Sequence, residues 1–449
     1  MPRNSTSSAL SIMIVAGEAS GDKHGASLAR ALNGLYPETR FELFGSGGDE
    51  MRAAGVETLI DAREVAIIGV PEIARALGKL YRAYRTLSAA ARARRPAAVV
   101  LIDWPDFNMR LAKKLHHEGF KIVYYISPQV WAWRRYRIRA LRRDVDRLLV
   151  ILPFEEEFYR RAGVEVEYVG HPLAGAVSAT ITRDDFCRRY GLDPARSLIA
   201  LLPGSRHKEI HYHLPVMLDA AIRLRDADFS SPVLGSESAD KSVVKSQSSN
   251  FKLQIPDSQS IQSTIRSPRS IDQQSLIRSP QFVIPLASTI RPEQVGAAIH
   301  DAQHKLRCAA QTELNVKVIE GDAYNALCHS QFAIVASGTA TVEAALAGTP
   351  MVIIYRGSEL NWRLIRPLIR LDTFGMVNLI AGRKIVPELM QRSATGENIA
   401  AEASAILSDP SRLSDMRRDL ELVGESLAAG PGSGAERAAK AVMGVISRS

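Results

Sequence analysis

The sequence has little cysteine and no long hydrophobic run, and both shortages exclude whole classes of protein. Only Cys187, Cys308 and Cys328 occur in 449 residues, without the spacing of a metal site, so we expect neither a disulfide framework nor a zinc site. No run approaches about 18 apolar residues, so the sequence predicts no transmembrane helix. Residues 1–9 are polar and the apolar stretch 10–15 is too short for a signal peptide, which predicts a cytoplasmic protein.

The sequence also lacks the patterns of metal-dependent and nicotinamide-dependent enzymes. Its two D-x-D stretches, 144–146 and 226–228, lie in an arginine-rich helical run and beside a polar segment. We interpret them as ordinary solvated positions and not as ligands of Mn²⁺ or Mg²⁺. The glycine-rich turns at 17–25 and 45–48 form no G-x-G-x-x-G with a downstream ribose-binding acid. The sequence therefore predicts no metal and no other cofactor.

A repeated order of strand, turn and helix runs through the chain. Short apolar runs lie at 11–16, 41–44, 99–102, 122–126, 148–152 and 166–169 in the first half, and at 198–202, 282–286, 316–319, 332–335 and 350–355 in the second. Polar or glycine-containing turns follow these runs, and helical patterns follow the turns. This alternation predicts an α/β protein whose parallel sheets are covered on both faces, with ligands at the carboxyl ends of the strands.

The length of the chain favours two domains. We predict two doubly wound, Rossmann-like domains, 1–180 and 181–390, that face one another across a cleft. The helices expected at 391–449 could cross back to the first domain. Residues 230–280 are rich in serine and glutamine and have little apolar periodicity, so we predict a disordered insertion there. A tolerated loop expansion explains it better than a regulatory arm.

The most informative single stretch follows the apolar run 332–335. Gly338 permits close backbone approach, the hydroxyls of Ser337 and Thr339 can bind oxygen atoms, and the helix that follows offers unpaired N–H groups to an anion. Glu343 could accept hydrogen bonds from a ribose diol. The stretch predicts a pocket for a nucleotide diphosphate, and an ordinary capped helix between two buried strands is the alternative.

Positive charge gathers in two places within a chain of formal net charge +9. The arginine-rich stretch 134–147 could attract phosphate, or it could be a solvated helix face. No recognised nucleic-acid-binding module surrounds it, so we predict no nucleic-acid partner. Residues 73–87 combine basic residues with an apolar stripe that includes Leu77, Leu80 and Tyr84. This pattern favours a helix lying in an anionic membrane surface, and a core helix is the alternative.

Taken in order, the motifs of the chain resemble those of the lipid-A-disaccharide synthase family. The matching stretches are 16–22 (AGEASGD), 102–108 (IDWPDFN), 127–134 (SPQVWAWR), 152–155 (LPFE), 170–173 (GHPL), 202–206 (LPGSR), 320–322 (EGD), 336–343 (ASGTATVE), 378–383 (NLIAGR) and 386–389 (VPEL). Each motif alone is weak, whereas the ordered set spans nearly the whole chain. Gly175, where the family often has Asp, and the insertion at 230–280 depart from the pattern.

This resemblance implies a GT-B fold and a glycosyl transfer in lipid A synthesis. The donor would be UDP-2,3-diacylglucosamine and the acceptor would be 2,3-diacylglucosamine 1-phosphate, called lipid X. The products would be a β-1,6-linked disaccharide 1-phosphate and UDP, which requires inversion at the anomeric carbon. Because the substrates are acylated, the protein would associate peripherally with the anionic surface of the inner membrane. The oligomeric state stays open, and a homodimer is compatible with the resemblance.

The resemblance also suggests roles for individual residues. Asp103 is the first choice for the base that deprotonates the acceptor hydroxyl. Glu18 would be a second cleft acid, which could position the acceptor or serve as the base instead. Structural roles in the turns are the alternatives for both acids. We expect Asp106 and Asn108 to cap a helix that begins near Met109, with a substrate contact as the alternative.

The remaining expectations concern the second half of the chain. Arg206 would bind the diphosphate, since its guanidinium is a fixed fork of donors. The predicted substrate-binding residues are Arg206, Ser337, Gly338, Thr339, Glu343, Asn378, Glu388 and Asn108. A UDP-sugar 2-epimerase or another GT-B transferase would share the fold and Glu343. An NAD-dependent oxidoreductase and a non-catalytic basic adaptor are rivals from other classes.

Overall fold

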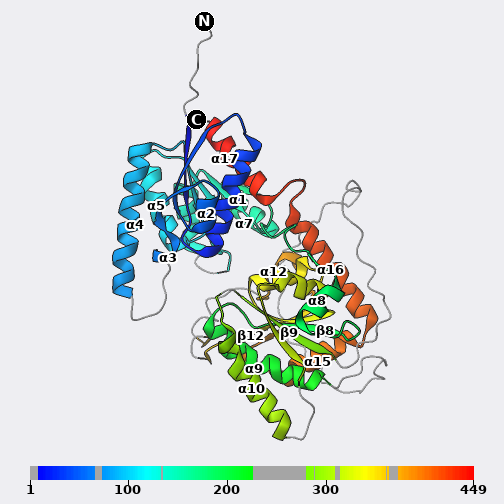
Figure 1. Cartoon of the computed structure of the whole chain (residues 1–449). Coiled ribbons are helices and arrows are strands. Elements are labelled where there is room, and N and C mark those ends of the chain that lie inside the picture. Colours follow the sequence, from blue (N-terminus) through cyan, green and yellow to red (C-terminus); the bar gives the residue numbers. More distant parts are fainter. Residues whose placement is uncertain are drawn as a thin grey trace. The chain divides into compact units, whose positions relative to one another are not determined.

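The computed structural model describes residues 9–65, 73–132, 135–225, 280–287, 289–308, 314–359, 362–363 and 373–448. The chain divides into two compact units (Figure 1). The first unit combines Met1–Ala174 with Glu425–Ser449, and the second is Gly175–Gly424. Apart from its last position, the insertion predicted at 230–280 lies outside the described residues.

A parallel sheet forms the centre of the first unit. Its strands are β1 (Leu10–Val15), β2 (Phe41–Gly47), β3 (Glu57–Asp61), β4 (Ala98–Ile102), β5 (Ile122–Tyr125), β6 (Arg147–Val150) and β7 (Val166–Tyr168). Their spatial order is β3-β2-β1-β4-β5-β6-β7, and each neighbouring pair is parallel. The strand order therefore reverses between β1 and β4, which is the position where doubly wound sheets bind their ligands.

Helices cover both faces of this sheet because its strands are apolar on both sides. The helices are α1 (Ala19–Leu35), α2 (Asp49–Ala53), α3 (Ala62–Val65), α4 (Ile73–Arg94), α5 (Pro105–His117), α6 (Ile138–Asp144), α7 (Pro153–Arg161) and α17 (Gly434–Ser447), with a short 3-10 turn η2 (Arg135–Arg137) before α6. Met13 and Val15 of β1 join one buried cluster with residues of α4 to α7. Ile12 and Ile14 join another with residues of α1 and α17. Alternate residues of one strand thus serve opposite cores.

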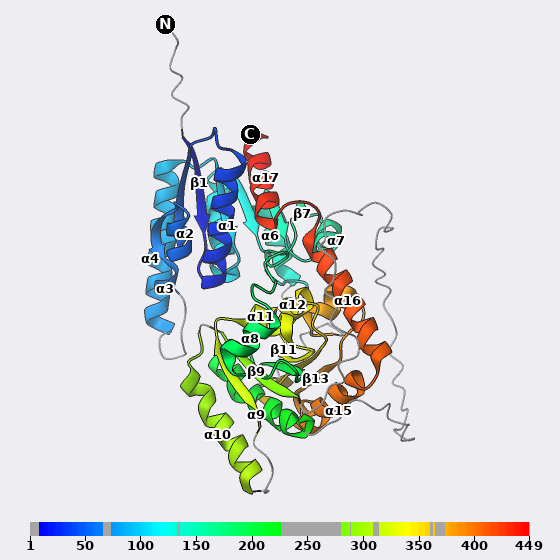
Figure 2. The ribbon, with the colours of Figure 1, turned by 45° about the vertical axis from the view of Figure 1, so that its right-hand side comes forward.

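Figure 2 shows α17, from the end of the chain, beside α1, and these two helices are in contact. Ala438, Ala439 and Val442 of α17 are fully buried in the same cluster as Ala26 and Leu32 of α1. The last helix of the chain is therefore part of the core of the first unit.

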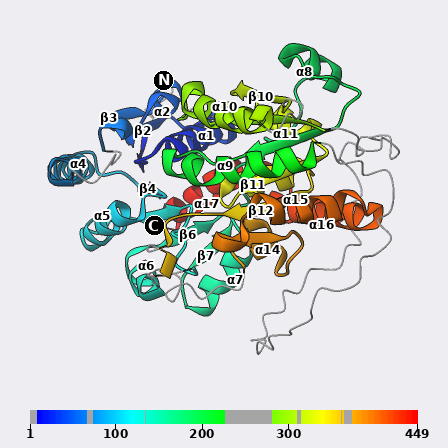
Figure 3. The same cartoon turned by 90° about the horizontal axis from the view of Figure 1, so that it is seen from below.

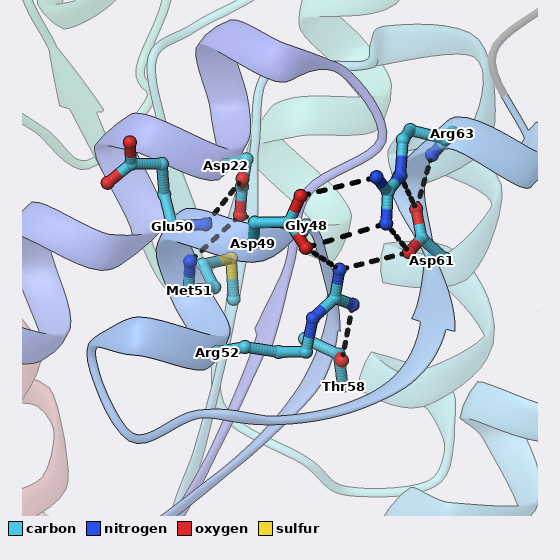
Figure 4. Close-up of polar contacts among 9 residues, drawn as sticks. All are labelled: Asp22, Gly48, Asp49, Glu50, Met51, Arg52, Thr58, Asp61 and Arg63. Carbon is cyan, nitrogen blue, oxygen red and sulfur yellow. Dashed lines mark hydrogen bonds and ion pairs between the residues drawn. The ribbon is translucent and has the colours of Figure 1, made fainter.

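Asp22 of α1 ties the first helix to the loop before α2 (Figure 4). Its carboxylate accepts hydrogen bonds from the backbone N–H groups of Gly48 at 2.6 Å, Glu50 at 3.1 Å and Met51 at 3.0 Å. These donors belong to the start of α2, where no helical carbonyl is available to them. A network of exposed ion pairs joins α2, β3 and α3 beside this cap.

The second unit repeats the plan of the first. Its strands are β8 (Leu198–Leu202), β9 (Gln281–Leu286), β10 (Val316–Glu320), β11 (Phe332–Ala336), β12 (Met351–Tyr355) and β13 (Glu388–Met390). They lie in the order β10-β9-β8-β11-β12-β13, again parallel throughout, so the order reverses between β8 and β11. The predicted fold class, an α/β protein with two doubly wound sheets, is confirmed.

Helices also surround the second sheet. They are α8 (Arg183–Tyr190), α9 (His207–Leu224), α10 (Pro292–Cys308), α11 (Ala323–His329), α12 (Thr339–Leu346), α14 (Met376–Ala381), α15 (Gly396–Leu407) and the first part of α16 (Pro410–Ala428), with a 3-10 turn η4 (Gln391–Ser393). Figure 3 shows α9 beside α10, with which it is in contact. In the described part of the chain, no helix combines the length and hydropathy needed to cross a membrane.

Two strands escaped the sequence prediction. β3 forms one edge of its sheet and has no fully buried residue, because its sequence is Glu-Thr-Leu-Ile-Asp. β13 is an edge strand of three residues. Both lack the run of buried apolar residues that identifies a central parallel strand.

Candidate active site

Asp103 directly follows β4, at the reversal point of the first sheet. It and Trp104 have φ angles of 48° and 49°, a left-handed conformation that is costly for residues other than glycine. The surrounding core holds this turn in place. The carbonyl of Asp103 accepts hydrogen bonds from the buried hydroxyl of Tyr124 at 2.7 Å and from Nδ2 of Asn108 at 2.8 Å. Strain of this kind, fixed by buried donors, is typical of functional sites.

The carboxyl group of Asp103 has the electrostatics of a general base. Burial, and then the negative charge of Glu18, raise the pKa of Asp103 to about 6. Both effects disfavour the ionised form. A base whose pKa lies close to neutral pH is largely ionised at pH 7 and still accepts a proton readily.

Glu18 lies across the reversal point from Asp103. It follows β1, which pairs directly with β4, and it occupies the N-cap position of α1 with an exposed side chain. No side-chain capping hydrogen bond engages its carboxylate. The two acids predicted from the sequence therefore stand at neighbouring strand ends of one unit, with Glu18 facing solvent and Asp103 largely buried.

Trp104, which the sequence analysis did not single out as a site residue, lies next to Asp103 in the chain and packs against Gly17, the residue before Glu18. A Cβ atom placed on Gly17 would lie 2.1 Å from the Trp104 ring, so only glycine permits this packing. On the other side the indole stacks on Phe107, with ring centroids 3.9 Å apart and an interplanar angle of 10°. The left-handed turn at Asp103 thus aims an aromatic ring across the end of β1.

The expected helix cap at Asp106 and Asn108 is wrong. Helix α5 begins at Pro105, earlier than the sequence indicated, because proline suits the first position of a helix. Asn108 lies inside the helix and is fully buried, and its Nδ2 donates to the carbonyls of Ile102 and Asp103. Asp106 is exposed and pairs with Arg137. A substrate contact by Asn108 stays a prediction.

A groove of about 1160 Å³ lies between α4 and α5, next to Glu18 and Trp104. Gly17, Glu18, Trp104 and Phe107 line one end of it. The residues that line the rest are Leu80, Tyr81 and Tyr84 from α4, and Pro105, Asp106, Arg110, Lys113, Lys114, His117 and Glu118 from α5 and the turn after it. Figure 3 shows the two helices side by side. Leu77 belongs to α4, but its side chain lies outside the described residues.

Two histidines near the same strand ends are neutral at physiological pH. Burial lowers the pKa values of His24 and His171 to about 4, and their mutual repulsion contributes to the shift at His171. His171 accepts a hydrogen bond from the backbone N–H of Leu173 at its Nδ1 atom and donates its own backbone N–H to Leu427. The role of His171 in this structure is to hold its turn.

The turn predicted to bind a nucleotide diphosphate follows β11 in the second unit. Gly338 has a φ angle of 155°, and a Cβ atom at this position would meet no other atom within 4 Å. The backbone here is therefore open to an approaching ligand. The exposed Thr339 begins α12, Ser337 donates from Oγ to the carbonyl of Phe374, and Glu343 lies partly buried on the second turn.

Arg206 lies four residues after β8, the strand that pairs with β11. It is the N-cap residue of α9, and Glu209 binds its backbone N–H at 3.2 Å and its guanidinium at 3.0 Å. Its side chain remains 79% exposed. A single exposed ion pair is weak, so a diphosphate could displace Glu209 from the guanidinium.

Asn378 and Glu388 bind each other at 2.7 Å. Oδ1 of Asn378 accepts from the backbone of Ile385 and Val386, while Glu388 accepts from the N–H groups of Phe374 and Gly375. These bonds shape the segment that receives Ser337. The pair thereby supports the turn after β11, and its contact with substrate stays a prediction.

The D-x-D stretch at 144–146 has a structural role. The prediction that both of its acids are ordinary solvated residues is wrong for Asp144. Asp144 is buried and pairs with Arg143, and Asp146 accepts the backbone N–H of Ile122. The other D-x-D stretch, 226–228, lies outside the described residues. Across the described ranges, no three His, Cys, Asp or Glu side chains are grouped to hold a metal ion.

Two doubly wound units within one chain define the GT-B class of fold, and solved structures agree. A putative UDP-N-acetylglucosamine 2-epimerase from Listeria monocytogenes matches with a TM-score of 0.58 and 14% identity, covering 98% of this chain and 96% of its own. The calicheamicin glycosyltransferase CalG4 matches with a TM-score of 0.52 and 13% identity, covering 98% and 99%. At such low identity these structures show the fold alone.

Sequence relatives define the family within that class. The family model described as "Lipid-A-disaccharide synthetase" matches residues 12–271 and 281–442. A lipid-A-disaccharide synthase from Koribacter versatilis is 40% identical over 442 residues, covering 98% of this chain and 99% of the relative. Another from Geobacter sulfurreducens is 39% identical over 437 residues, covering 97% of both. The chain belongs to the lipid-A-disaccharide synthase family.

Proposed function

We propose that this member of the family transfers 2,3-diacylglucosamine from UDP to the 6-hydroxyl of lipid X. The observation that carries the proposal is the pair of acids at the reversal point of the first sheet. Asp103 has a raised pKa of about 6, and the neighbouring Glu18 is exposed. Asp103 takes the proton of the acceptor hydroxyl while the hydroxyl oxygen attacks the anomeric carbon. The bond from that carbon to UDP breaks in the same step, and the configuration inverts.

The second unit would hold the nucleotide. The open backbone at Gly338 and the N-terminus of α12 would accept the diphosphate, and Arg206 would neutralise the charge that develops on departing UDP. Ser337 and Thr339 would add hydroxyl donors, and Glu343 would bind the ribose. Asn378 and Glu388 would act through the segment 374–375 that they hold.

The protein would meet its acylated substrates at the cytoplasmic face of the inner membrane. Support comes from α4, where Tyr81 is 63% exposed and Leu80 and Tyr84 are partly buried. With Leu77 they would form the apolar side of a helix that also carries Lys79, Arg82 and Arg85. No step of this proposal requires a second copy of the chain.

The decisive experiment incubates the purified protein with UDP-2,3-diacylglucosamine and lipid X in neutral detergent, and measures both UDP and the disaccharide 1-phosphate. We expect equal amounts of the two products, with the new linkage in the β configuration. UDP release without disaccharide, or interconversion of UDP-N-acetylglucosamine with its 2-epimer, would contradict the proposal and favour a different enzyme of the same fold class.

A further inference from the structure

The groove between α4 and α5 has two chemically different walls. On α4 the lining side chains are Leu80, Tyr81 and Tyr84, which are aliphatic or aromatic. On α5 they include four basic residues, Arg110, Lys113, Lys114 and His117. The two carboxylates on this side, Asp106 and Glu118, already pair with Arg137 and with Arg92 and Lys114. The spacing of these four is i, i+3, i+4 and i+7, so they form one row along a single face of the helix. A ligand that fits both walls has to be apolar on one side and anionic on the other.

The core fixes which face of α5 the groove receives. Phe107, Leu111, Ala112 and Leu115 of the same helix are buried in the apolar cluster of the first unit. Turning the basic row away from the groove would expose these four apolar side chains to water, which is unfavourable. The basic row is therefore a permanent feature of the groove.

The members of the row differ in the charge available to a ligand. Lys114 lies 3.1 Å from Glu118, which also pairs with Arg92. Lys114 and His117 lie in the last turn of α5, where the helix dipole favours cations. Arg110 and Lys113 lie before that turn and are exposed, and no carboxylate of the described residues forms an ion pair with either. Neither the helix dipole nor an ion pair within the protein therefore explains why Arg110 and Lys113 are basic.

From this arrangement we infer that Arg110 and Lys113 bind the phosphate monoester of the acylated acceptor, whose acyl chains lie against the α4 wall. The inference rests on the proposed function and assigns one wall of the groove to one substrate. A phosphate between two cations one helical turn apart forms charge-assisted hydrogen bonds with both. Arginine adds a planar fork that matches the geometry of phosphate.

The position of the row suits the geometry of such an acceptor. Its reacting hydroxyl and its phosphate are carried by the same sugar ring, so both must be held within the length of one sugar and one long side chain. Arg110 lies five residues after Pro105, about 8 Å along the helix axis at about 1.5 Å per residue. Pro105 itself follows Asp103 and Trp104, so a sugar at Asp103 places its phosphate within reach of the arginine.

The test compares two acceptors in neutral detergent micelles, lipid X and the same 2,3-diacylglucosamine without its phosphate. We expect the variant Arg110→Ala/Lys113→Ala to raise the KM for lipid X at least about tenfold, because the loss of even one charge-assisted bond to the phosphate contributes about that factor. The KM for the phosphate-free acceptor, the KM for the donor and kcat should stay within about twofold. The matched control is Arg160→Ala/Arg161→Ala, which removes two exposed charges from α7 outside the groove and should leave all four values unchanged.

Three results would overturn the inference. An unchanged KM for lipid X would remove the two residues from the subsite. An equal rise for both acceptors would show that the substitution acts through structure and not through phosphate. Weaker binding to anionic phospholipid vesicles, with unchanged kinetics in micelles, would assign the row to the bilayer instead of the acceptor.

Direct binding separates this inference from the proposed function. Equilibrium binding of lipid X is measured in the same micelles without donor, for the wild type and for Arg110→Ala/Lys113→Ala. If the wild type forms no disaccharide but binds lipid X at least about tenfold more tightly than the variant, the proposed reaction fails and the subsite stands. If it forms disaccharide and the two proteins bind lipid X equally, the subsite fails and the reaction stands.

Discussion

At the scale of single residues, Asp103 owes its chemistry to its backbone as much as to its carboxyl group. A left-handed turn at both Asp103 and Trp104 ends β4 abruptly, and Tyr124 and Asn108 hold the carbonyl of that turn from inside the core. The carboxyl group is thereby kept largely buried next to a second acid, where its pKa rises.

Asp103→Asn should lower kcat at least about 10²-fold, because general-base catalysis contributes typically that much. UDP binding, which we assign to the second unit, should be unchanged. In the wild type, kcat/KM should rise with pH up to about 6 and then level off, because the base acts only when its carboxyl group is ionised. Near-normal turnover in the variant would exclude Asp103 as the base.

Glu18→Gln tests the coupling between the two acids. Removing the charge of Glu18 removes one of the two causes that raise the pKa of Asp103, while burial remains. The acidic limb of the kcat/KM profile should therefore shift to lower pH in the variant, whatever the change in its maximum. A limb that stays in place would show that the group titrating near pH 6 is not Asp103 beside an ionised Glu18.

At the scale of secondary-structure elements, one buried acid organises the loop after β5. Glu155 of α7 accepts hydrogen bonds from Ser127 Oγ at 3.1 Å, from Trp131 Nε1 at 3.0 Å and from its own N-cap residue, Leu152. Tyr159 of the same helix donates to the carbonyl of Pro128 at 2.8 Å. The S-P-Q-V-W motif and the L-P-F-E motif thus belong to one polar network. Arg137, which pairs with Asp106, follows the first of these motifs in the chain.

Burial raises the pKa of Glu155 from 4.5 to about 7. Between these values the folded protein binds more protons at this site than the unfolded chain does, so the contribution of Glu155 to stability declines as pH rises. Relative to Glu155→Gln, the wild type should lose about 2 kcal/mol of unfolding free energy between pH 5 and pH 8, measured by urea denaturation. Glu157→Gln, on the exposed side of the same helix, should show no such decline. Parallel curves for the wild type and Glu155→Gln would refute the assignment.

Helix α4 packs on the core with some side chains and exposes an apolar side chain with others. Substitutions on it can therefore separate effects on membrane binding from effects on stability. Tyr81→Ser should weaken binding to anionic liposomes and raise the apparent KM for acylated acceptor, with little change in stability, because Tyr81 is largely exposed. Leu80→Ser/Tyr84→Ser should do the same and also destabilise the fold, since both residues pack on the core. Leu87→Ser is the control, since Leu87 is fully buried and its replacement should act on stability alone. Unaltered liposome binding by folded Tyr81→Ser and Leu80→Ser/Tyr84→Ser would place the membrane contact elsewhere.

At the scale of the whole molecule, the chain ends inside the unit in which it began. Arg437 of α17 secures that return, since its guanidinium donates to the carbonyls of Val169 at 2.8 Å, Gly432 at 2.8 Å and Pro431 at 3.0 Å. It thereby ties α17 to the end of β7 and to the turn that follows α16. The first unit is consequently discontinuous in sequence.

Arg437→Ala should reduce the unfolding free energy of the first unit by about 2 kcal/mol, because the buried carbonyl of Val169 would lose a charged donor. Lys440→Ala removes an exposed charge from the same helix and should change stability by less than about 0.5 kcal/mol. Thermal denaturation of the full chain followed by circular dichroism measures both. Equal melting of the two variants would mean that Arg437 is not needed to dock α17.

Much of the architecture could be predicted from local sequence. The central strands are apolar on both faces, and turns rich in glycine and polar residues end them, so β4, β8 and β11 were placed within a residue of their observed bounds. These signals are strong because a strand buried on both faces has few polar residues to confuse its pattern. The same signals were absent from the edge strands β3 and β13.

The chain's own sequence determined which residues are candidates for the chemistry, and the tertiary structure decided the environment of each. Glu18 and Asp103 were identified at strand ends, but the raised pKa of Asp103 depends on burial and on a charge that is distant in sequence. Asn108 looked like a helix cap, and its actual place inside α5 follows a left-handed turn whose carbonyl is held by Asn108 itself and, from a distant strand, by Tyr124. The groove beside them exists only because α4 and α5 pack on one face of the sheet. Local patterns encode elements, whereas dielectric environment, strain and cavities arise from contacts between residues far apart in the chain.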